Sequence, residues 1–196
     1  MSEVKVDKIS PRSGTDVTLG DSGDTFTIPS GATITNSGTA TGFGGDNTPS
    51  FHASLSVDQT GTTNSAWNKI EFDREDWDTD SAYDNSTNYR FTVPAGEGGK
   101  YVFVVNVGVA PTSGSDAATD YASVRIYKNG SGYPTGSGMV RVPVNASGGD
   151  VYLGCTTPVE LAATDYVEAY CWHDMGTSRK FAESTSFFAG WKLIGV

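Results

Sequence analysis

The chain has 196 residues, 24 of them glycine, and a formal net charge of −10. This length suits one domain of ordinary size with a short additional segment. The acidic balance excludes a role in binding nucleic acid, because contact with phosphates requires a basic surface. No apolar run approaches the ~20 residues that are needed to cross a membrane, so membrane insertion is not expected.

Residues 1–45 carry few aromatic residues and show short β-like triplets between polar turns. Each triplet offers only one or two apolar side chains, too few for a single chain to offset the entropy lost on ordering. Two interpretations stay open: a flexible tail, or an extended β-prism or β-helical stalk that neighbouring chains complete. The triplets are Val17–Leu19, Phe26–Ile28 and Thr33–Thr35.

Two stretches of this segment are similar in sequence to repeats in structural proteins and fibres of tailed phages, notably marine ones. The two stretches are Ile9–Asp21 and Thr27–Ile34. The resemblance implies a virion protein that contacts other virion proteins through residues 1–45. The first eight residues are mostly polar and charged, so no signal peptide is expected. We therefore expect the protein to be made in the host cytoplasm and to be located on the virion.

Residues 46–50 end a Gly- and Pro-rich stretch and are interpreted as a linker, so a head is expected over 51–196. Phe51, Ala53 and Leu55 alternate with polar residues, the period of a half-buried strand. A second, less regular strand is expected to follow at Trp67–Phe72.

Six acidic residues lie within the twelve positions from Asp73 to Asp84. Several carboxylates close together suit calcium, which takes oxygen ligands, and Asp76, Asp78 and Asp80 are the candidate ligands. The stretch lacks the Gly and the bidentate Glu of an EF-hand loop, so a solvated acidic loop is the simpler interpretation. No other cofactor is expected.

The stretch from Tyr83 to Phe103 predicts two strands joined by a tight turn. Phe91 and Val93 alternate with polar residues, and Pro94 ends the run because proline cannot donate to a strand ladder. Glycines permit the reversal, after which Tyr101 and Phe103 resume the alternation toward Val109.

Phe91, followed by Gly99-x-Tyr101-x-Phe103, resembles the signature of C1q/TNF-like jelly-roll domains. Lys128-Asn129-Gly130 and the run Ser186–Ile194, which looks like the closing strand of that family, add to the resemblance. It covers about residues 51–195 and implies an all-β, two-sheet jelly-roll sandwich with Greek-key connections that forms a homotrimer. Some members of the family bind calcium.

Two cysteines, Cys155 and Cys171, flank a reversal near Ala163. A disulfide across the strands is conceivable, and two buried free thiols are the simpler alternative.

No catalytic motif is present: the sequence has no Gly-x-Ser-x-Gly elbow, no His-Glu-x-x-His and no phosphate-binding loop. We therefore expect binding and assembly rather than an enzyme.

The candidate contact residues are Tyr133, Trp77 and Trp172, because Tyr and Trp anchor partners and stack on sugar rings.

These patterns favour a trimeric phage fibre or spike whose head attaches to a glycan or protein on the host surface. Two alternatives remain: a capsid decoration or head-fibre protein held to the virion by residues 1–45, and a secreted bacterial lectin-like adhesin.

Overall fold

The computed structural model describes residues 7–35, 37, 47–112, 121–134, 140–143, 150–176 and 179–193. The chain divides into two units, Met1–Phe43 and Gly44–Val196. The described residues of the first unit form neither helix nor strand. Across the described part of the chain, no helix has the length and apolarity needed to span a membrane.

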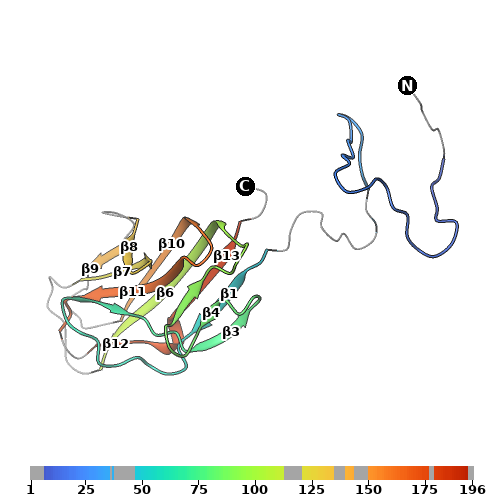
Figure 1. The fold of residues 1–196 in the computed structure, drawn as a ribbon. Helices are drawn as coiled ribbons and strands as arrows, with labels where there is room; N and C mark the ends of the chain where they lie inside the picture. The colour runs from blue at the N-terminus through green and yellow to red at the C-terminus, as the bar shows by residue number, and fades with distance from the viewer. Residues whose placement is uncertain are drawn as a thin grey trace. The chain divides into compact units, whose positions relative to one another are not determined.

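The second unit consists of two antiparallel sheets (Figure 1). Sheet A has the order β10-β6-β13-β1-β3, and a further short strand, β12, pairs with β6. Its strands are β1 (Ser50–Ser54), β3 (Arg74–Asp78), β6 (Gly99–Pro111), β10 (Val151–Leu161), β12 (Arg179–Phe181) and β13 (Phe187–Lys192).

Sheet B has the order β4-β5-β11-β7-β8, with β2 paired to β11 and β9 paired to β7. Its strands are β2 (Ala66–Lys69), β4 (Tyr83–Asp84), β5 (Arg90–Thr92), β7 (Tyr121–Lys128), β8 (Ser131–Tyr133), β9 (Val140–Pro143) and β11 (Tyr166–His173). A single 3-10 turn in the described residues, η1 (Glu183–Thr185), precedes β13.

The chain passes repeatedly from one sheet to the other, for example from β6 in sheet A to β7 in sheet B and from β10 back to β11. This crossing between two antiparallel sheets gives the all-β jelly-roll sandwich that the sequence predicts. The last strand, β13, lies between β6 and β1, so the predicted closing strand takes a central place in its sheet.

Aromatic side chains fill the space between the sheets. Phe51 lies at the centre, with its ring 4.7 Å from that of Tyr83, 5.2 Å from Phe91 and 4.9 Å from Phe188. The predicted alternation in β6 is confirmed, because Tyr101 and the residues at every second position to Val109 are fully buried. A core of this kind ties the two sheets into one body by apolar burial.

The strand β10 runs without a break from Val151 to Leu161 and pairs with β6 along its whole length. Pro158, which looks like an interruption, is accommodated because β10 is the edge strand of sheet A. Asn129-Gly130 forms a tight hairpin turn between β7 and β8, with positive φ at both residues.

Candidate functional site

The acidic stretch after Asp73 forms a strand, not the solvated loop that the sequence favours. Arg74–Asp78 is β3, the edge of sheet A, and pairs with β1 through a bulge next to His52. Its residues are mostly exposed. An edge strand is exposed to solvent, so acidic side chains are tolerated there. Their charge also discourages pairing with strands of other chains.

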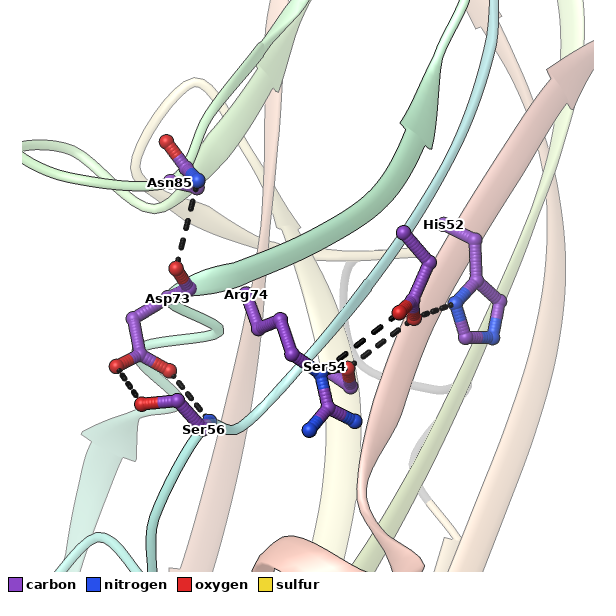
Figure 2. Close-up of polar contacts among 7 residues, drawn as sticks. His52, Ser54, Ser56, Asp73, Arg74 and Asn85 are labelled. Atoms are coloured by element: carbon purple, nitrogen blue, oxygen red, sulfur yellow. Dashed lines mark hydrogen bonds and ion pairs between the residues drawn. The ribbon is translucent and has the colours of Figure 1, made fainter.

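A polar network joins β3 to the outer face of β1 (Figure 2). Asp76 Oδ2 lies 2.7 Å from Nδ1 of His52 and accepts a hydrogen bond of 3.1 Å from the hydroxyl of Ser54. Nε of Arg74 donates to the same hydroxyl at 2.9 Å and lies 3.7 Å from Asp76 Oδ1. The predicted calcium ligand Asp76 is therefore engaged by protein donors and one nearby cation.

A second cluster lies where β3 begins, and Figure 2 shows it beside the first. Asp73 accepts hydrogen bonds from the backbone N–H of Ser56 at 2.7 Å and from its hydroxyl at 2.5 Å, and the Asn85 amide donates to the Asp73 carbonyl at 3.4 Å. Burial alone would raise the pKa of Asp73, but the Ser56 hydrogen bonds outweigh it and the pKa lies below its ordinary value. This cluster fixes the turn into β3.

The structure does not bring Asp76, Asp78 and Asp80 into one ligand set. Asp78 accepts backbone hydrogen bonds from Tyr83 at 2.8 Å and Asp80 at 3.3 Å. Asp80 accepts from the Thr79 hydroxyl at 2.7 Å. Within the described residues, no group of three His, Cys, Asp or Glu side chains is arranged to hold a metal ion.

The His52 ring is stacked between two aromatic side chains. Trp77, which is 51% exposed, lies 4.9 Å away on one side, and Phe187 lies 5.2 Å away on the other. A shallow groove of about 460 Å³ runs past this stack and is also lined by Asn106, Tyr152 and Thr185. The Ser54 hydroxyl lies on the Asp76 side of this pair, where it donates to Oδ2, and within the described residues His52 itself hydrogen-bonds to no hydroxyl or thiol. The exposed stack and the groove beside it offer a surface for contact with a partner.

The groove borders a larger surface, which we call the outer face of sheet A. Cross-strand register places its residues in neighbouring rows, with the charged pair Lys100 and Glu160 at one end and the Arg74–Asp76 pair at the β3 edge. Between these charged groups, the rows of β6 and β13 carry mainly apolar side chains. The outer face of sheet A comprises His52, Trp77, Val102, Val104, Asn106, Thr156, Pro158, Phe187, Ala189 and Trp191.

The three aromatics predicted as contact residues lie in different places. Trp77 is on the outer face of sheet A. Tyr133 is half-buried in β8 and packs against the core. Trp172 is on the outward side of sheet B, where its ring stacks on Tyr121 at 4.4 Å. They do not form one contact surface.

Sequence reasoning did not single out the other aromatics on the outward side of sheet B. Trp67 of β2 lies across from Trp172, and Tyr127 of β7 lies 4.0 Å from Tyr170 of β11. The signal was available, because in both β7 and β11 aromatic or charged residues alternate with the apolar residues of the core.

Cys155 and Cys171 are free and buried, in β10 and β11 of different sheets. Burial raises the pKa of Cys155 to about 11 and also raises that of Cys171. His173, two residues on, is fully buried with Nε2 at 2.9 Å from the Thr62 hydroxyl, and burial lowers its pKa. These side chains belong to the core because they are buried. The raised pKa values of the two thiols also oppose thiolate chemistry.

No family model matches this sequence, and no curated protein matches it. Among solved structures, the chain is similar to the globular domain of zebrafish complement 1qA protein. That similarity has 15% sequence identity and a TM-score of 0.48, and it covers 74% of this chain and 97% of that chain.

Proposed function

We propose that this chain is a non-enzymatic virion structural protein, a trimeric fibre or spike of a tailed phage. Its β-sandwich head attaches to a glycan or protein on the host surface, and residues 1–45 contact other virion proteins. The observation that carries the proposal is the contrast between a head with a complete core and an N-terminal segment that leaves its apolar side chains in solvent.

Six apolar side chains of that segment are 40% to 70% exposed in the single chain. Leaving so many large apolar groups in water is unfavourable, so they need a partner surface. Neighbouring copies of the same segment and other virion proteins both supply one. The six side chains are those of Ile9, Val17, Leu19, Phe26, Ile28 and Ile34.

The outer face of sheet A supports the trimer. Interfaces between like subunits have apolar, aromatic-rich centres from which charged residues are depleted. Val102, Val104 and Trp191 lie side by side on this face, and Trp77 extends it across β1. We propose that three copies meet through this face around a threefold axis, which leaves the outward side of sheet B in solvent.

The test is the location of the chain on a particle. Antibody raised against the head and labelled with gold should mark tail fibres or spikes of the purified virion in negative-stain images. Label spread over the capsid would favour the decoration protein instead. A chain found only in the culture medium, never on particles, would favour the secreted adhesin and contradict the viral assignment.

A further inference from the structure

The outward side of sheet B carries a lattice of aromatic and charged side chains, which we call the aromatic face of sheet B. Register places Lys69 opposite Tyr170 and Tyr170 opposite Arg125, in one row across β2, β11 and β7. The adjacent row is Trp67, Trp172 and Ser123. The aromatic face comprises Trp67, Lys69, Tyr121, Arg125, Tyr127, Glu168, Tyr170 and Trp172.

Arg125 is the fixed centre of this face. Its guanidinium carbon lies 4.2 Å from the ring centre of Trp67 and 4.8 Å from that of Tyr127. One terminal nitrogen also donates to the Tyr127 hydroxyl at 3.0 Å. A guanidinium that is stacked on two rings loses little further freedom when it binds a ligand, because its orientation is already set.

Gly132 of β8 leaves the space that this arrangement needs. A Cβ atom at Gly132 would lie 2.2 Å from the guanidinium carbon of Arg125, closer than real contacts allow. The φ angle of Gly132 is not positive, so an alanine there strains no backbone and displaces only the end of the Arg125 side chain. The glycine therefore matters for where the cation lies.

Arg125 has no carboxylate partner within the described residues, although the chain is strongly acidic. Its Nε is shielded from solvent and lacks a hydrogen-bond acceptor in that part of the chain. The neighbouring cation differs, because Lys69 is paired with Glu168 at 2.6 Å. The Arg125 side chain as a whole is only partly buried. A guanidinium without an anion favours an anionic ligand, since planar carboxylates match its terminal nitrogens with two parallel hydrogen bonds.

An aromatic platform lies next to this cation. Trp172 is half-buried, stacks on Tyr121, and pairs across the sheet with Ser123, two residues before Arg125 on β7. Alternate residues of a strand are about 7 Å apart on one face, which is close to the width of a pyranose ring with its carboxylate. Flat aromatic surfaces next to a charged donor are suited to sugar rings that carry an acid group.

We propose that the aromatic face of sheet B binds a carboxylate-bearing sugar of an acidic polysaccharide. The carboxylate accepts hydrogen bonds from Arg125, and the ring lies against Trp172. The inference rests on the attachment function proposed above and specifies its ligand class. The same face remains in solvent when copies meet through the outer face of sheet A.

The experiment is calorimetric titration of the full-length protein with trigalacturonate and with sialyllactose, each beside its methyl ester. The acids should bind with dissociation constants of about 1 mM or tighter, and the esters about tenfold more weakly. Arg125→Gln should weaken acid binding about tenfold, and Gly132→Ala should weaken it with little change in melting temperature. Arg90→Gln is the matched control, because Arg90 also stacks on a tyrosine, Tyr166, at 4.2 Å, on a different strand.

Absence of binding to both acids would overturn the proposal, and so would equal affinity for acid and ester. Equal weakening by Arg90→Gln and Arg125→Gln would indicate diffuse charge attraction and contradict a defined site. A carboxylate-bearing peptide that binds more tightly than either sugar would replace the glycan by a protein ligand. None of these results changes where gold-labelled antibody marks the chain on the particle. Failure of this inference can therefore be distinguished from failure of the proposed function.

Discussion

Gly190 of β13 faces Phe103 of β6 so closely that a Cβ atom at Gly190 would lie 2.5 Å from Cδ1 of that ring and 2.9 Å from Cε1 of Phe51. Both rings are fully buried in the central aromatic cluster and have no room to move aside. This contact gives the glycine of the closing strand a packing role.

Gly190→Ala should therefore destabilise the head by about 1–3 kcal/mol, the usual cost of overpacking a dense core. Urea unfolding followed by tryptophan fluorescence measures the change. Gly98→Ala is the control, because a Cβ there meets its nearest atom at an ordinary 3.5 Å. An unchanged unfolding midpoint for Gly190→Ala would show that the aromatic cluster is looser than described.

Asp165 makes the stability of the head depend on acid pH. Its carboxylate accepts hydrogen bonds from Asn129 at 2.8 Å and the Ala162 N–H at 2.9 Å, and it pairs with Lys128 at 3.0 Å. These contacts lower its pKa from 3.8 to about 2. A lowered pKa in the folded state stabilises the fold above the ordinary value, and the stabilisation is lost as the pH falls from about 4 through 2.

Asp165→Asn should cost ~1 kcal/mol at pH 7, less than the pKa shift alone suggests because solvent screens the carboxylate. The difference between variant and wild type should shrink at pH 2, where the native carboxyl is half protonated. Urea midpoints at several pH values measure it. A difference that is constant from pH 7 to pH 2 would rule out this linkage.

The two cysteines should be unreactive in the native protein. Cys155 and Cys171 are buried, and their raised pKa values keep both as thiols. Ellman's reagent should react with neither at pH 8 and with both after denaturation in guanidinium. Failure to detect thiols in the unfolded chain would show that they are joined in a disulfide.

Calcium should have the same small effect on the wild type and on Asp78→Ala. The Asp78 carboxylate already caps the turn before β4 through Tyr83, so its removal should cost ~1 kcal/mol with or without the ion. Asp80→Ala should cost less, since within the described residues that side chain bonds only to the adjacent Thr79 hydroxyl. A calcium-induced rise in melting temperature that disappears in Asp78→Ala would instead establish the cation site.

The strands and core were largely predictable, because burial imposes the period of two that Phe91 and Val93, and then Tyr101 and Phe103, display in the sequence. Arg74–Asp78 was misread as a loop, since an exposed edge strand needs no apolar residue and leaves no alternation to detect. The Arg125–Trp67 contact could not be foreseen, because it depends on pairing between β2 and β11 and on the close approach of Gly132.

The trimer should depend on the outer face of sheet A. Val104→Glu places a charge in the middle of this face, where register sets it opposite Thr156 and Ala189. Burial of an unpaired charge at an interface is costly, so the variant should dissociate while its head stays folded. Ser131→Glu, at an exposed position of sheet B, adds the same charge and should leave assembly unchanged.

Sedimentation equilibrium of the full-length protein tests the proposed assembly most directly. Three copies of the 20.6-kDa chain should give a single species of about 62 kDa, reduced to the mass of one chain by Val104→Glu. A wild-type protein that sediments as one 20.6-kDa chain at every concentration would contradict the account.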